Sequence, residues 1–147
     1  MLTIHAADRL RLDDATLLDG GAVAVEGDRI AAVGTLAEVR ERFPAARVRQ
    51  WPGVLGPGRV HEGPLPDAPS PRERVHAVLK TGAVAVLTQH AGTPELRSAA
   101  ARNDVLVLDR SRPAAVVVAG RADLAVFDDG GACLATVCAG RLVHRRR

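Results

Sequence analysis

The sequence predicts an α+β fold in which β-rich segments at both chain ends flank a short α/β segment. Residues 2–33 alternate apolar and polar side chains, as antiparallel strands do. Residues 70–108 then alternate two helical patterns with two continuous apolar runs, which is typical of a parallel βαβ unit. Residues 115–143 return to short strand-like runs separated by turns that contain glycine.

The first β-rich segment contains a predicted hairpin and a predicted helix. Apolar runs lie on both sides of Gly27, a residue that suits the tight turn of a hairpin. Thr35 and Glu38 have the spacing of a capping box at a helix N-terminus. We therefore expect a helix over residues 35–43, followed by a strand at 47–51.

The α/β segment has its own start and stop signals. Ser70-Pro-Arg-Glu73 matches a second capping box with proline at the first helical position, and Thr93-Pro94 begins another helix. The apolar runs at 83–87 and 105–108 predict two buried strands. The last third of the chain then predicts strands at 115–118, 123–127, 134–138 and 142–143.

Length and composition indicate a single globular domain over residues 1–147. The chain has 47% hydrophobic residues but only 2% aromatic ones, so the core must be built from Val, Leu and Ala. No run approaches the roughly 18 apolar residues of a membrane span, and polar residues such as His5 interrupt any signal peptide. We expect a cytoplasmic protein in which Cys133 and Cys138, on opposite faces of one strand, stay reduced.

The basic residues favour no particular partner. The formal net charge is +3, and Arg141, His144 and residues 145–147 form a basic cluster at the C-terminus. Such a tail could touch nucleic acid or an anionic lipid, but the chain lacks aromatic stacking residues, a Gly-rich loop or a recognition helix. Nucleic acid is therefore not an expected partner, and a membrane is not expected either.

Four stretches resemble the amidohydrolase superfamily, especially the imidazolonepropionase and aminodeoxyfutalosine deaminase type. They are GGAVAVEGDRIAAVG, WPGVLGPGRV, GRADLAVFDD and TVCAGRLVHRRR. The resemblance implies a small β-sandwich built from both chain ends, which in the family flanks a metal-dependent (β/α)8 barrel. We expect residues 1–58 to form the N-terminal part of this sandwich and 113–147 the C-terminal part. Residues 59–112 would form a short βαβ insert in place of the barrel.

The resemblance assigns no metal ligand to this chain. After the Pro-Gly pair the family has a His-x-His motif, and its two histidines would fall at Gly63 and Leu65. His61 lies two positions too early, and Lys80 lies within a predicted helix. A complete barrel takes about 250 residues, so the barrel strands that carry the family's later ligands are missing. We therefore assign no catalytic residue, metal or cofactor.

One polar segment is a candidate ligand site. In TQHAGTP, Gln89, His90 and Thr93 lie between a predicted strand and a predicted helix start, where ligand crevices and anion sites occur in α/β proteins. His61 is a further candidate for the same site. The alternative interpretation is that His90 is a polar loop residue without a ligand.

Two hypotheses of function follow. The first is a non-catalytic amidohydrolase-like protein, a pseudoenzyme that acts through association or as an accessory subunit. A short parallel insert leaves strand edges and apolar surface uncovered, which favours a homodimer or a complex with another protein. The alternative is a small-molecule-binding protein, or a hydrolase or deaminase-like enzyme, that uses a crevice near His90 completed by a partner chain.

Overall fold

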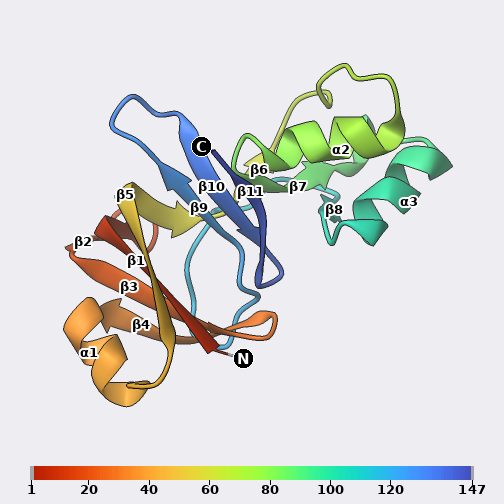
Figure 1. The fold of residues 1–147 in the computed structure, drawn as a ribbon. Helices are drawn as coiled ribbons and strands as arrows, with labels where there is room; N and C mark the ends of the chain where they lie inside the picture. Colours follow the sequence, from red (N-terminus) through yellow and green to blue (C-terminus); the bar gives the residue numbers. More distant parts are fainter. Residues whose placement is uncertain (1, 147) are drawn as a thin grey trace.

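The computed structural model describes residues 2–146 and contains one large sheet and one small sheet (Figure 1). The strands of the large sheet are β1 Leu2–Arg11, β2 Leu17–Asp19, β3 Gly21–Glu26, β4 Arg29–Thr35, β5 Arg47–Pro57, β9 Leu124–Phe127, β10 Cys133–Cys138 and β11 Arg141–Arg145. The small sheet contains β6 Arg59–His61, β7 Ala83–Leu87 and β8 Leu106–Leu108. The helices are α1 Leu36–Arg42, α2 Pro71–Leu79, the 3-10 turn η1 Thr88–His90, and α3 Pro94–Arg102.

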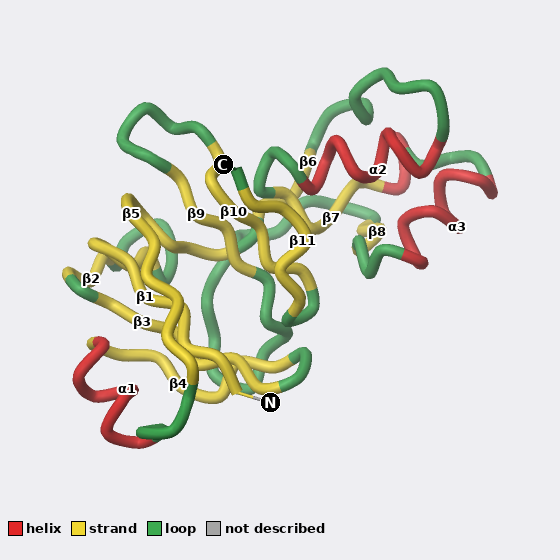
Figure 2. The backbone as a smooth tube through the Cα atoms, in the orientation of Figure 1, coloured by secondary structure: helices red, strands yellow, loops and turns green. Residues whose placement is uncertain are grey.

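The large sheet combines strands from both chain ends. Its order is β11-β10-β9-β5-β1-β3-β4, with β2 paired to β1. Strand β5 joins the two groups, because it runs parallel to β1 and antiparallel to β9. The strands curl around a common interior (Figure 2). This arrangement confirms the predicted α+β fold with a sandwich built from both ends of the chain.

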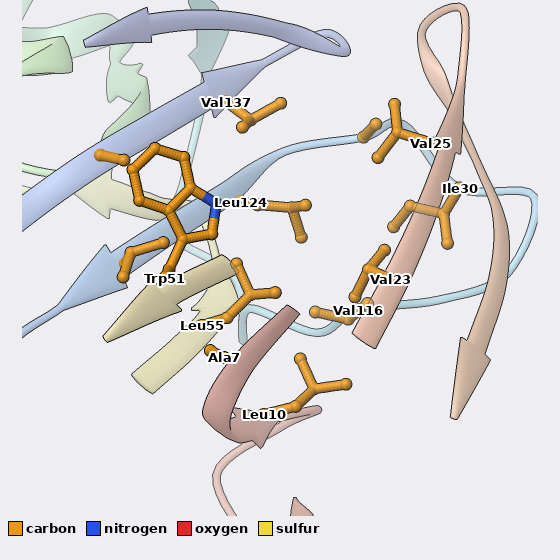
Figure 3. Packing of buried hydrophobic residues seen from close by; sticks show 13 residues of the cluster. Ala7, Leu10, Val23, Val25, Ile30, Trp51, Leu55, Val116, Leu124 and Val137 are labelled. Carbon is orange, nitrogen blue, oxygen red and sulfur yellow. The ribbon is translucent and has the colours of Figure 1, made fainter. Parts of the chain in front are cut away.

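The core of this sandwich is almost entirely aliphatic. Side chains from the N-terminal strands, such as Val23, and from the C-terminal strands, such as Leu124 and Val137, point toward one another (Figure 3). Trp51 is the single aromatic residue of this cluster of buried residues. Many small contacts therefore hold the two chain ends together, as the low aromatic content predicts.

The predicted hairpin and first helix are both present. Gly27 has a φ of 60°, a conformation that glycine adopts readily, and it turns β3 into the antiparallel β4. Thr35 caps α1: its Oγ1 accepts a hydrogen bond from Glu38 N at 3.2 Å, and Thr35 N donates to Glu38 Oε1 at 3.1 Å. The capping box is thus complete.

The small sheet follows the predicted parallel pattern. Strands β6, β7 and β8 are parallel, and α2 and α3 lie side by side next to them, at the opposite end of the molecule from α1 (Figure 1). Because opposite residues of paired strands share a face, His61, Val86 and Val107 form one row. Val86 and Val107 belong to the apolar cluster of α2 and α3, so this row faces the helices. Val60, Ala85 and Leu106 form the row on the other face.

The structure corrects three expectations for individual elements. Residues 115–118 form no strand: Val116 is buried in the sandwich core, whereas Val117 and Val118 are more than half exposed. The strand predicted at 105–108 covers only Leu106–Leu108, and these residues are partly buried because β8 lies at an edge of its sheet, whereas Val105 before it is buried. At α2, Ser70 Oγ accepts from Glu73 N at 3.2 Å, but no return bond from the Glu73 side chain completes a capping box.

Two further observations concern the chain as a whole. Within residues 2–146, no helix is long and apolar enough to cross a membrane. Cys133 and Cys138 are both free thiols. They do not lie on opposite faces as predicted, because an irregularity of β10 after Cys133 places its Sγ 3.5 Å from Thr136 Oγ1, on the face of Cys138. The domain boundaries at residues 58 and 112 stay a prediction.

Candidate functional site

The carboxyl ends of β6, β7 and β8 form the candidate site. Parallel strands end at the same edge of a sheet, and polar side chains follow each strand here. His61 ends β6, the turn Thr88–His90 follows β7, and Asp109 follows β8. This edge corresponds to the position where a complete barrel of the same strand direction carries its active site.

A hydroxyl group connects two of these strand ends. Thr88 Oγ1 lies 3.0 Å from Asp109 Oδ1 and 3.1 Å from the Leu108 carbonyl oxygen. A hydroxyl has one proton, so Thr88 shares it between two acceptors. Thr88 and Asp109 were missed in the sequence analysis, although each directly follows an apolar run that predicts a strand.

The candidate residues after β7 already have local partners. Gln89 Nε2 lies 3.2 Å from His90 Nε2, and Thr93 Oγ1 accepts a hydrogen bond from Leu96 N at 3.2 Å as the N-cap of α3. Gln89 and Thr93 are exposed, and His90 is half-buried. The structure therefore gives Thr93 a capping role.

His61 points away from the face that lines the interior of a complete barrel. It lies in the row of Val86 and Val107, on the side of the helices, and its Nε2 is 2.9 Å from the carbonyl oxygen of Pro64. This hydrogen bond closes a short loop after β6. The contact is local and does not bring His61 together with the residues after β7.

The two positions where the resemblance would place metal-binding histidines, Gly63 and Leu65, have different surroundings. Leu65 is 3% exposed and belongs to the apolar cluster that includes Val75 and Val78 of α2. The loop is also tied to α2, because Arg74 Nη2 donates to the Leu65 carbonyl at 3.0 Å and Arg74 Nε donates to the Pro66 carbonyl at 3.1 Å. Gly63, by contrast, has open space beside its backbone. Of the two positions, only the second is part of the core, where Leu65 is buried.

The opposite face of the small sheet borders a cavity of about 310 Å³. Val60 and Ala85 line it from the sheet, and Val117 lines it from the segment after β8. At one side, Arg121 Nε lies 2.9 Å from both carboxylate oxygens of Asp123. This face would be the interior of a closed barrel, but here it meets a loop and an ion pair.

The five main surface cavities of residues 2–146 do not bring the four predicted ligand residues together. Five surface cavities of about 310 to 500 Å³ are lined by residues other than His61, Gln89, His90 and Thr93. Among residues 2–146, no three His, Cys, Asp or Glu side chains gather closely enough to hold a metal ion. A ligand site formed by these four residues stays a prediction.

One family model matches part of the sandwich. Residues 21–46, which comprise β3, β4, α1 and the turn before β5, match the model of the bacterial imidazolonepropionase-like composite domain. No curated protein matches the sequence significantly. The family match lies in the stretch that carries the resemblance to amidohydrolases, and it confirms that resemblance.

Solved structures share the fold at low sequence identity. Guanine deaminase of E. coli is 14% identical with a TM-score of 0.56, over 73% of this chain and 35% of that one. An adenosine deaminase from Xanthomonas campestris is 19% identical with a TM-score of 0.56, over 72% and 33%. N-acetyl-D-glucosamine-6-phosphate deacetylase from Mycobacterium smegmatis is 12% identical with a TM-score of 0.52, over 97% of this chain and 99% of the matched one. The chain spans about a third of the two deaminase chains.

Proposed function

We propose that this amidohydrolase-like composite domain acts through self-association and not through catalysis. The observation that carries the proposal is the three-stranded parallel sheet, in which β6 and β8 each pair on one side only. Such edges present unpaired backbone N–H and C=O groups that another strand can bind. A second copy of the chain carries the same edges and therefore supplies a matching surface without a further partner.

Apolar side chains next to these edges support association. Leu106 and Leu108 are only partly buried and share the face of Ala85, opposite the helices. Val117 and Val118, in the loop that borders this face, are 57% and 54% exposed. Covering this surface would remove apolar area from water, at about 25 cal/mol for each Å².

The packing of the loop after β6 supports a role without metal chemistry. Leu65 contributes to the core of the insert, and Arg74 holds the backbone on both sides of the Leu65–Pro66 peptide. A metal ligand at this position would have to leave that core. The proposed non-catalytic role therefore agrees with how the segment folds.

Sedimentation velocity at micromolar concentrations tests the proposal. We expect the wild-type chain to be a dimer and the Leu106→Lys and Val117→Lys variants to be monomers, since each places a charge on the apolar face. Leu17→Lys is the matched control, because Leu17 is 41% exposed on β2 of the sandwich. Circular dichroism checks that each variant is folded.

Two results would contradict self-association. One is a wild-type chain that stays monomeric over the whole concentration range. The other is a dimer that Leu106→Lys and Val117→Lys leave intact. If the chain is instead a monomer that binds a different protein through the same face, that protein and not a second copy is the partner.

A further inference from the structure

Basic side chains gather around a cavity in the sandwich, on strands outside the small sheet. In the parallel pairing of β1 with β5, Thr3 lies opposite Arg47 and His5 lies opposite Arg49. Alternate residues of a strand share a face, so all four side chains point to the same side, where they line a cavity of about 410 Å³. The spacing Thr3-x-His5 and Arg47-x-Arg49 is visible in the sequence, but only the strand register brings the two pairs together.

Two glycine turns close one side of this cavity. Gly27 of the β3–β4 turn and Gly140 of the β10–β11 turn both line it. Gly140 has a φ of 81°, and a Cβ atom there would lie 1.8 Å from the Gly27 carbonyl oxygen. The two turns therefore approach more closely than a side chain would permit, and the cavity has a defined wall.

His5 directs a hydrogen-bond donor into the cavity. Its side chain is 4% exposed, and Trp51 Nε1–H donates to its Nδ1 at 3.1 Å. Nδ1 is thus an acceptor, so the proton of the neutral ring lies on Nε2. Burial and, to a smaller extent, the charge of Arg49 together lower the pKa of His5 to about 4, which keeps the ring neutral near pH 7.

The Nε2 atom of His5 has no partner within the described residues. Every fully enclosed side-chain nitrogen and oxygen among those residues has a hydrogen-bond partner. Nε2 therefore has to be open to the cavity that His5 lines. A buried donor that reaches only into a cavity is the kind of group that fixes a polar ligand.

The arginines around the cavity have no acidic partner. The ion pairs of residues 2–146 are Arg29–Asp28, Arg121–Asp123 and Arg141–Asp104, and no Asp or Glu lines this cavity. Burial and the charges of Arg47 and Arg145 lower the pKa of Arg49, so the guanidinium groups repel one another. An anion between them would relieve this repulsion.

We propose that this cavity binds a small oxyanion, namely phosphate or the phosphate group of a monoester. Arg47 and Arg49 supply forked donors that match phosphate oxygens, and His5 Nε2–H supplies a further donor from a buried position. Val25 and Leu142 give the cavity apolar walls, and its volume leaves room for an organic group beside the phosphate. The site lies in the composite sandwich and is independent of the proposed self-association.

Trp51 provides a built-in reporter for this site. It is the single tryptophan of the chain, it is hydrogen-bonded to His5, and the guanidinium carbon of Arg145 lies 5.6 Å from its ring centroid. The test is a titration of the full chain with inorganic phosphate and with phenyl phosphate at constant ionic strength. Binding is followed by Trp51 fluorescence and, in parallel, by calorimetry, so that a spectroscopically silent complex is still detected.

We expect saturable binding of both probes, with phenyl phosphate the tighter one because its ring can contact the apolar walls. Arg49→Gln should weaken binding at least about tenfold, since it removes one guanidinium group that can donate two hydrogen bonds to the phosphate. Arg110→Gln is the matched control: Arg110 is exposed, lines none of the five cavities, and removes the same charge. This control should bind as the wild type does.

Either of two results would overturn the oxyanion site. The first is the absence of saturable binding of both probes in both measurements. The second is an equal loss of affinity in Arg49→Gln and Arg110→Gln, which would show a general response to net charge. If inorganic phosphate binds and phenyl phosphate binds no more tightly, the phosphate site stands, but the cavity does not accommodate an organic group.

Discussion

His5 shows how one buried residue can make the stability of this fold depend on pH. Burial, followed by the charge of Arg49, lowers its pKa from 6.5 to about 4. As the pH falls from 6.5, the unfolded chain binds a proton at this position before the folded chain does. The stabilisation is therefore complete above pH 6.5 and is lost as the pH falls to about 4. The difference corresponds to about 3 kcal/mol.

His5→Asn tests this linkage. The Asn oxygen can still accept from Trp51 Nε1, but the side chain does not titrate. The free energy of unfolding is measured by urea unfolding at pH 6.5 and at about pH 4. Over this range the wild type should lose about 3 kcal/mol more than His5→Asn does. Burial also lowers the pKa of His144, but that residue is present in both proteins and cancels in the comparison. Equal losses in both would contradict the assignment.

The two cysteines should differ in reactivity. Cys138 is fully buried, and burial raises the pKa of its thiol to about 11, so almost no thiolate is present near pH 7. Cys133 is only partly buried. In the folded protein we expect an aromatic disulfide reagent to modify Cys133 first, and Cys138 only after urea unfolds the chain. Cys133→Ala should abolish the early reaction, and two equally fast thiols would contradict the prediction.

At the scale of elements, local signals predicted most of the structure. The Gly27 hairpin, the Thr35 cap of α1 and the proline starts of α2 and α3 are all present, because each depends on residues close in sequence. The strand expected at 115–118 is absent. Its β-branched run favours a strand, but the segment connects the two sheets and only Val116 enters a core. The segment forms no strand because of its position between the two sheets, which its local sequence does not show.

The loop after β6 provides a test at this scale. Leu65→His should lower the free energy of unfolding by about 2–5 kcal/mol, because it removes a buried aliphatic group and buries a polar ring. Gly63→His is the matched control and should change stability little, since no atom lies within 4 Å of a Cβ added there. Urea unfolding measures both. Equilibrium dialysis should show no stoichiometric zinc in the double variant, and tight zinc binding would show that the loop keeps a ligand-binding conformation.

For the whole molecule, the sequence indicated the order of β-rich, α/β and β-rich segments but not the contacts between them. The resemblance implied a sandwich from both chain ends, and the sheet order confirms it. The side-chain chemistry of His61 and His90 and their places at strand ends are visible in the sequence, but their local partners depend on loop conformations. The cavity of His5 and Arg49 depends on the register of two distant strands, which no local pattern displays.

The insert and the sandwich are joined by polar contacts, one of them fully buried. Thr136 of β10 is fully buried, and its Oγ1 donates to the Leu79 carbonyl at the end of α2 at 2.7 Å. Arg121 contacts Asp123 and the Cys138 thiol, and it also donates to the Asp104 carbonyl after α3. These contacts connect segments that are distant in sequence, so we expect the two parts to unfold as one cooperative unit.

Thr136→Val tests that cooperativity. The substitution keeps the shape of the side chain but removes one of two donors to the Leu79 carbonyl, which still accepts from Gly82 N at 3.2 Å. The loss of this buried hydrogen bond should cost about 0.5–1.5 kcal/mol. Thr81→Val is the matched control: Thr81 Oγ1 donates to the Val78 carbonyl at 2.6 Å, but Thr81 is exposed and water can replace it, so its loss should be smaller. Trp51 fluorescence follows the sandwich, and far-ultraviolet circular dichroism follows the helices. Because Thr136 links the two parts, both signals should shift together in Thr136→Val, whereas separate transitions would show that the insert unfolds independently.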